Sequence, residues 1–114
     1  MISGSFNMGI STHILDISLG KPVFGLEVFL WKKSDEIYVN LSHGTSDSNG
    51  RINFLDEPEI NSYKLEFLVE EYFKKQQIKS FYPKISIDFS ILDNQHYHIP
   101  LLLSPFGFST YRGS

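Results

Sequence analysis

Short runs of β-branched and aromatic residues recur along this 114-residue chain, and turn-forming residues separate them at regular intervals. Such spacing predicts many short strands and is typical of an all-β sandwich or barrel. The length fits one domain. One short helix is expected at residues 70–76, where acids precede lysines as the helix dipole favours. Seven or eight strands are expected, at residues 10–17, 26–33, 36–41, 51–55, 63–69, 84–91, 95–103 and 106–112. We therefore predict an antiparallel β-sandwich.

Composition excludes several classes of protein. The chain has no cysteine, which rules out a disulfide framework, a cysteine nucleophile and a thiolate zinc site. No apolar stretch approaches the ~18 residues that span a membrane. The net charge of −3 provides no basic field, so we expect neither nucleic acid nor membrane as a partner. Residues 1–9 are polar and lack a signal-peptide pattern, so we expect a flexible lead, a domain over 10–114 and a cytoplasmic location.

Three basic residues stand where hydrophobic periodicity does not explain them. His13 lies in the middle of a predicted strand, His98 precedes a very apolar run, and Arg51 directly follows the Asn-Gly turn at 49–50. A single strand histidine is more often structural than catalytic, and an arginine after a turn is usually solvated, so both interpretations remain open. His96 shares a face with His98 by the period of two, but no third ligand is identifiable and no metal site is predicted.

The last strand and the C-terminus carry two further anomalies. Pro100 cannot donate to a ladder, so it predicts either a strand edge or a bulge, and a bulge would re-aim His98. The segment 106–114 stays aromatic and polar to its last residue, which indicates a terminus packed against something.

These features together match one family. The motifs are Ser-Thr-His-Ile-Leu-Asp at 11–16, Gly-Lys-Pro at 20–22, and Thr-Ser-Asp-Ser-Asn-Gly-Arg at 45–51. Closing motifs follow at 97–105, beginning Tyr-His-Ile-Pro, and at 109–114, which reads Ser-Thr-Tyr-Arg-Gly-Ser. Over residues 10–114 the chain resembles the 5-hydroxyisourate hydrolases, the transthyretin-related proteins of purine catabolism.

The resemblance implies a transthyretin-like sandwich of two four-stranded sheets and a homotetramer with active sites at the interface between dimers. It also implies hydrolysis of 5-hydroxyisourate to 2-oxo-4-hydroxy-4-carboxy-5-ureidoimidazoline without a metal or organic cofactor. The two histidines would activate water and transfer protons, and the arginine would stabilise developing charge. The implied catalytic residues are His13, Arg51, His98 and Ser114, and the implied substrate-binding residues are His13, Arg51, Tyr111, Arg112 and Gly113.

Two other functions stay open, because one fold can carry many functions. Transthyretin itself shares the fold and carries small hydrophobic hormones between its subunits. A carrier of that kind is expected to have apolar or small residues where this chain has His13, Arg51 and His98. The other alternative is an inactive sandwich that serves only protein contacts.

Overall fold

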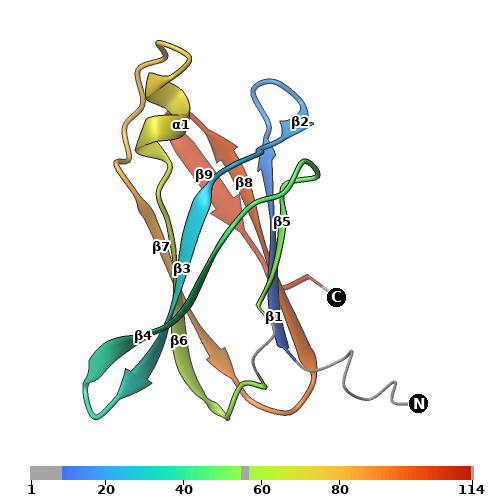
Figure 1. Ribbon diagram of the computed structural model, residues 1–114, viewed down its shortest axis with the longest axis vertical. Helices are drawn as coiled ribbons and strands as arrows, with labels where there is room; N and C mark the ends of the chain where they lie inside the picture. Colours follow the sequence, from blue (N-terminus) through green and yellow to red (C-terminus); the bar gives the residue numbers. More distant parts are fainter. Residues whose placement is uncertain (1–8, 55–56, 114) are drawn as a thin grey trace.

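The computed structural model describes residues 9–54 and 57–113, which form two facing β-sheets with one short helix at one end (Figure 1). One sheet has five strands, in the order β2-β1-β8-β9, and β5 pairs with the same edge of β1 as β2, opposite β8. The other has four, in the order β4-β3-β6-β7. The predicted sandwich with one short helix is therefore confirmed.

The strand bounds follow the predicted segments closely. The five-stranded sheet contains β1 (Gly9–Asp16), β2 (Lys21–Pro22), β5 (Arg51–Phe54), β8 (His96–Ser104) and β9 (Gly107–Thr110). The four-stranded sheet contains β3 (Glu27–Ser34), β4 (Ile37–Thr45), β6 (Asn61–Phe67) and β7 (Ile85–Ile91), and the helix α1 spans Glu70–Lys74.

Three details of the sheets differ from the prediction. β1 and β8 pair in parallel, from Gly9 with His96 to Asp16 with Leu103, whereas the other pairs are antiparallel. The two-residue strand β2 adds a fifth member to a sheet expected to have four. β4 extends four residues beyond the predicted end at 41, because backbone pairing with β3 continues where its side chains turn polar.

The predicted flexible lead at 1–9 overlaps the described chain at one residue. Gly9 is the first residue of β1, paired with His96 of β8, so strand structure begins there. The rest of that segment, residues 1–8, lies outside the described residues.

The core lies between the sheets and follows the alternation of each strand. In β1 the inward residues Ile10, Thr12 and Ile14 are buried, and the Thr12 hydroxyl donates to the carbonyl of Ile99 at 2.6 Å. Tyr63 and Phe67 of β6 face them from the other sheet and are fully buried. The outward side chains of β1 are thereby left free to build a site on the opposite face of the five-stranded sheet.

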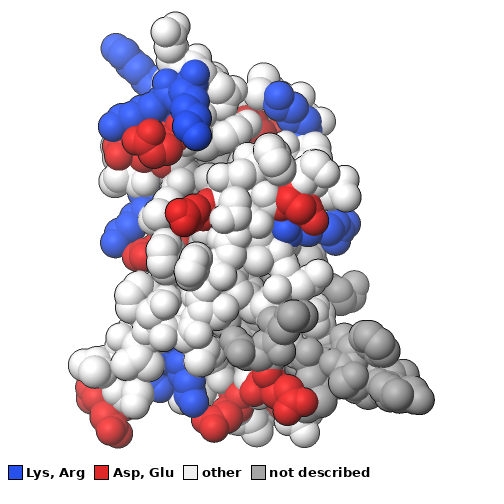
Figure 2. Space-filling view, viewed as in Figure 1, with Lys and Arg blue, Asp and Glu red and all other residues white. Residues whose placement is uncertain are grey.

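Charged side chains are spread unevenly over the face shown in Figure 2. Lysines and acids gather at the end of the molecule that carries α1, where Glu70 and Lys74 form an ion pair at 3.6 Å. Within the described part of the chain, no helix has the length and apolar character needed to cross a membrane.

Candidate active site

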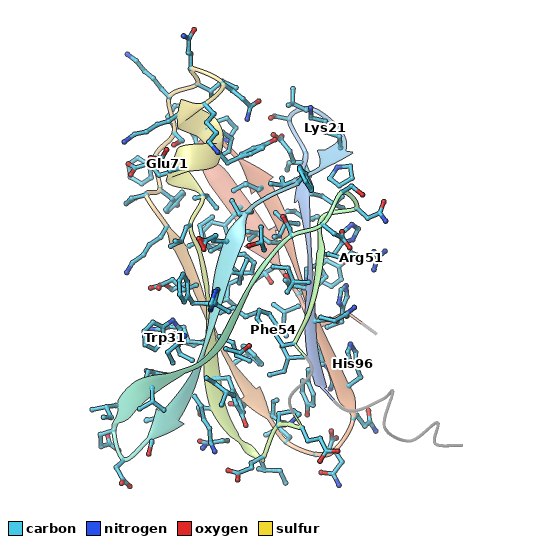
Figure 3. The ribbon with its side chains drawn as sticks, in the orientation of Figure 1. Lys21, Trp31, Arg51, Phe54, Glu71 and His96 are labelled. Atoms are coloured by element: carbon cyan, nitrogen blue, oxygen red, sulfur yellow. The ribbon has the colours of Figure 1, made fainter. Side chains whose placement is uncertain are left out.

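Three strands of the five-stranded sheet bring the predicted basic residues together. β1 lies between β5 and β8, and its register places His13 opposite Arg51 on one side and Pro100 on the other. Ser11, two residues earlier, lies opposite His98. Residues paired across strands, or two apart along one strand, point to the same face. His13, Arg51 and His98 therefore share the outer face of the sheet, and Figure 3 shows Arg51 and His96 on that side of the molecule.

The turn before β5 places Arg51 at the start of its strand. One carboxylate oxygen of Asp47 accepts the backbone N–H groups of Asn49 and Arg51, each at 2.9 Å. Gly50 occupies the left-handed region at φ +77°, and its carbonyl accepts the N–H of Ile14 at 2.7 Å. These hydrogen bonds hold the turn against β1, so the Asn-Gly pair determines the position of the Arg51 backbone at the start of β5.

Asp47 also brings a negative charge to the site. The hydrogen bond from the Arg51 backbone lowers the pKa of the Asp47 carboxyl, as do the Asn49 bond and the positive charges of Arg51 and His13, against an opposing effect of desolvation. Asp47 was not among the predicted site residues and stood only within the motif at 45–51. Its place in the Asp-Ser-Asn-Gly turn is typical of an aspartate that accepts backbone N–H groups within the turn. Its proximity to His13, in contrast, depends on the pairing of β1 with β5.

The surroundings of His98 disfavour its charged form. Burial lowers the pKa of His98, and electrostatic repulsion from Arg51, and from His13 and His96 when they are protonated, lowers it further. The neutral form is therefore favoured at neutral pH, where one ring nitrogen can donate and the other accept. A neutral imidazole on the same sheet face as the Arg51 guanidinium is suited to exchange hydrogen bonds with a substrate or a water molecule.

Ser11 and His96, which were not among the predicted site residues, also belong to this face. Ser11 Oγ lies 2.7 Å from Nε2 of His96 and 2.7 Å from Nδ1 of His98. The period of two already placed His96 beside His98, and it also places Ser11 on the face of His13. Serine has no hydrophobic signal, so the pattern alone did not show that its hydroxyl joins two rings.

Pro100 ends a ladder rather than forming a bulge. The β1–β8 register runs without a shift past Pro100, so the predicted bulge is wrong. The alternative of a strand edge fits locally, because the regular pairing of β8 with β9 does not include Pro100. β8 and β9 pair from Leu101 onward, and the Pro100 carbonyl, which faces β9, accepts the hydroxyl of Thr110 at 2.7 Å. The missing N–H of proline explains why regular pairing stops there.

Beyond this point the C-terminal segment returns to β8. Gly113 donates its backbone N–H to the carbonyl of His98 at 2.8 Å, which continues the β8–β9 register. A Cβ built on Gly113 would lie 2.8 Å from Cδ2 of His98, so the ring packs directly against the glycine. Tyr111 falls opposite Pro100 in the same register and is 56% exposed. The predicted packing of the C-terminus is confirmed as far as Gly113.

The structure does not bring every predicted residue into this group. The guanidinium carbon of Arg112 lies 4.1 Å from the ring centroid of Tyr97, which is buried on the opposite face of β8 from His98. Because neighbouring residues alternate between faces, Gly113 points to the outer face and Arg112 to the other. A direct role of Arg112 in substrate binding stays a prediction. Ser114 lies outside the described residues.

His96 and His98 lie two residues apart on β8, a spacing that puts both rings on one face of the sheet. Over residues 9–54 and 57–113, no three histidine, aspartate or glutamate side chains gather as a metal site requires. The two rings instead share the hydroxyl of Ser11.

Comparison with known proteins places this arrangement in a family. The family described as HIUase/transthyretin matches residues 10–113. This chain belongs to the HIUase/transthyretin family. A 5-hydroxyisourate hydrolase from Salmonella dublin is 42% identical over 109 residues, which cover 92% of this chain and 80% of that protein.

Solved structures of the family share the fold. The 5-hydroxyisourate hydrolase of Klebsiella pneumoniae has a TM-score of 0.82 and 37% identity, and the match covers 93% of this chain and 99% of that one. Sea bream transthyretin in complex with thyroxine has a TM-score of 0.87 and 25% identity, covering 92% and 94% of the two chains. The transthyretin-like sandwich is therefore confirmed, and because the same fold occurs in a hydrolase and in a transthyretin that binds thyroxine, the side chains of the site must distinguish the two.

Proposed function

We propose that this protein hydrolyses 5-hydroxyisourate in urate degradation, with the site on the outer face of the five-stranded sheet. The observation that carries the proposal is the convergence of two imidazoles and a guanidinium, His13, His98 and Arg51, from three adjacent strands. Relatives that carry the hydrolase name over most of the chain support it.

The reaction opens a ring at an acyl carbon bonded to nitrogen. As the oxygen of a water molecule bonds to that carbon, an imidazole nitrogen takes a proton from the water, and the carbonyl electrons move onto oxygen. Arg51 stabilises that negative charge with its fixed N–H groups. When the carbonyl re-forms, the carbon–nitrogen bond breaks, the leaving nitrogen takes the proton from the imidazolium, and the new carboxyl group ionises. Tyr111, exposed beside Pro100, supplies an aromatic surface for the ring.

The test is direct. Purified protein is expected to accelerate the loss of freshly generated 5-hydroxyisourate, followed by its ultraviolet absorbance. Arg51→Gln and His13→Gln are each expected to lower kcat/KM on the order of a hundredfold, with an unchanged circular dichroism spectrum. Full activity in both variants would contradict the site, and no acceleration by the folded wild-type protein would contradict the function.

A carrier function is the second candidate, because of the structural match to a thyroxine-bound transthyretin. The charged and hydrogen-bonding residues His13, Arg51 and His98 disfavour an apolar hormone on this face. Calorimetry with thyroxine distinguishes the two, since tight binding without turnover of 5-hydroxyisourate would favour the carrier.

We also propose that the active protein is a homotetramer whose sites lie between dimers. The outer face carrying Arg51 and Tyr111 is open in the single chain, which suits a site completed by another subunit. Light scattering of the active protein checks this, because an active monomer would rule out a shared site. Truncation after Tyr111 is expected to abolish activity while the tetramer persists. The cytoplasmic location stays a prediction.

A further inference from the structure

Ser11 joins two histidine rings on the outer face of the five-stranded sheet. Its hydroxyl oxygen lies 2.7 Å from Nε2 of His96 and 2.7 Å from Nδ1 of His98. Both distances are those of hydrogen bonds. Ser11 is only 5% exposed, so the hydroxyl is largely shielded from competing water. Both ring nitrogens are therefore paired with one oxygen atom.

A single hydroxyl group makes both contacts. A serine hydroxyl donates one hydrogen bond and can accept two, while a neutral imidazole carries its proton on one nitrogen and accepts at the other. If both rings donated to Ser11, the buried hydroxyl proton would have no acceptor among the described residues, because Ser11 Oγ contacts only these two ring nitrogens there. The remaining two arrangements have one ring donating and the other accepting, which couples the proton positions of His96 and His98.

The far nitrogen of His96 distinguishes these arrangements. Nδ1 of His96 is buried and has no hydrogen-bond partner among the described residues. If His96 accepted from Ser11, its proton would lie on Nδ1 as a buried N–H without an acceptor, which proteins rarely tolerate. If His96 donates from Nε2, only a lone pair remains at Nδ1. The second arrangement is the favourable one.

We propose that Ser11 fixes the tautomer of His98, accepting from Nε2–H of His96 and donating its own proton to Nδ1 of His98. Neutral His98 then carries its proton on Nε2. Ser11 and His96 are positioning residues that act through His98, and this role rests on the proposed hydrolase function.

This tautomer assigns different roles to His13 and His98, which the sequence did not distinguish. With Nδ1 occupied by Ser11, Nε2–H of His98 is the group that remains for the substrate. It donates a hydrogen bond to the oxygen that gains charge, beside Arg51. The lowered pKa of His98, caused first by burial and next by the charge of Arg51, keeps the ring neutral in this role. The water proton therefore goes to His13, which later returns it to the leaving nitrogen.

The ring is held from two sides for this purpose. Ser11 binds the Nδ1 side, and Gly113 packs against Cδ2 through its donation to the His98 carbonyl. These contacts fix both the proton position and the orientation of Nε2.

Nuclear magnetic resonance of the full-length protein with ¹⁵N-labelled histidine tests the tautomer without any variant. At pH 8 the ¹⁵N shifts of His98 are expected to show a protonated Nε2 and an unprotonated Nδ1. The ¹⁵N shifts of His96 are also expected to show a protonated Nε2 and an unprotonated Nδ1. A His98 ring protonated on Nδ1, wholly or in an equal mixture, would overturn the proposal.

Variants test the link to activity. Ser11→Ala is expected to give His98 a mixture of tautomers and to lower kcat about tenfold, the equivalent of one hydrogen bond, with little change in KM. His96→Gln, which retains an N–H donor, is expected to keep more activity than His96→Leu. Equal activity in these two variants, or an unchanged His98 tautomer in Ser11→Ala, would refute the positioning role.

The readouts separate this proposal from the proposed function. If the wild-type protein does not turn over 5-hydroxyisourate but shows the expected tautomers, the function fails and the Ser11 coupling stands. If turnover is rapid but His98 is protonated on Nδ1, the coupling fails and the function stands.

Discussion

Gly113 approaches the ring of His98 so closely that a Cβ on the glycine would lie 2.8 Å from Cδ2 of the histidine. The same glycine donates its N–H to the His98 carbonyl at 2.8 Å. Backbone pairing thus holds the C-terminal segment against the side chain, and only a residue without a Cβ fits there. The near-terminal glycine is part of the support for His98 rather than a spacer.

Gly113→Ala is therefore expected to lower kcat/KM on the order of ten- to a hundredfold, because the ring must move by a fraction of an ångström from its productive position. The assay is the loss of 5-hydroxyisourate absorbance. Gly107→Ala is the matched control, since a Cβ there meets its nearest described atom, Ser104 Oγ, at an ordinary 3.7 Å. Equal activity of the two variants would show that the contact at His98 is unimportant.

The charge of Arg51 is expected to set the pH at which His98 takes up a proton. Burial lowers the His98 pKa, and the charges of Arg51, His13 and His96 lower it further. Arg51→Gln removes one of these charges, so the His98 pKa rises toward its usual value and the ring is protonated at a higher pH. Nuclear magnetic resonance titration of the His98 ring measures the shift.

Arg51→Lys is the control for this titration, because it keeps the positive charge and loses only the guanidinium geometry. Its His98 pKa is expected to stay near that of the wild-type protein. A His98 pKa that moves equally in the glutamine and lysine variants would assign the effect to altered packing instead of charge.

The strands were predictable because alternation with a period of two is a local property of sequence. The segments at 26–33, 63–69 and 84–91 correspond to β3, β6 and β7 within two residues at each end. The parallel pairing of β1 with β8 was not predictable in this way, since it joins residues 87 positions apart, from Gly9 with His96 to Asp16 with Leu103, and depends on how the chain crosses between sheets. β2 was missed because two residues carry no periodic signal.

The residues of the candidate site also differ in how far the sequence could predict them. His13, Arg51 and His98 could be singled out from the sequence as polar residues in or beside apolar strands. Their convergence required the resemblance, because each strand alone left a structural interpretation open. Ser11 and His96 needed the register itself, since only the pairing of β1 with β8 brings the hydroxyl within 2.7 Å of both rings.

The turn before Arg51 provides a test of stability. Gly50 has φ +77°, and a Cβ there would collide with the carbonyl oxygen of Ile14. Gly20 has a similar φ of +70°, with open space around the Cβ position. Gly20→Ala is expected to reduce the free energy of unfolding by about 1 kcal/mol through backbone strain alone. Gly50→Ala is expected to reduce it by about 3 kcal/mol or more.

Urea unfolding of the two variants measures the difference. Because Gly50 also accepts the N–H of Ile14, Gly50→Ala is expected to displace Arg51 and lower activity, whereas Gly20→Ala keeps it. Equal losses of stability would mean that the chain relaxes around the added methyl group.

Asp16 and Tyr72 supply a second stability test, away from the site. The Tyr72 hydroxyl donates to one carboxylate oxygen of Asp16 at 2.6 Å, and the other oxygen accepts the backbone N–H groups of Ser18 and Leu19. Burial acts to raise the pKa of Asp16, but the hydrogen bonds from Ser18, Tyr72 and the backbone outweigh it and hold the pKa below the usual value. Burial and the Asp16 carboxylate raise the pKa of Tyr72 to about 12, so its hydroxyl stays a donor at neutral pH.

A carboxyl group with a depressed pKa binds fewer protons in the folded state than in the unfolded one. Its stabilisation is therefore complete above the unfolded value near 3.8 and is lost as pH falls through the folded value. Tyr72→Phe is expected to reduce the free energy of unfolding at pH 7 by about 1.5 kcal/mol, because it removes a hydrogen bond to a charged carboxylate. Urea unfolding between pH 7 and pH 3 is expected to show this difference shrinking below pH 4. Tyr82→Phe is the control, since the Tyr82 hydroxyl makes no hydrogen bond to a described residue, and an equal, pH-independent loss in both variants would exclude the Asp16 bond as the cause.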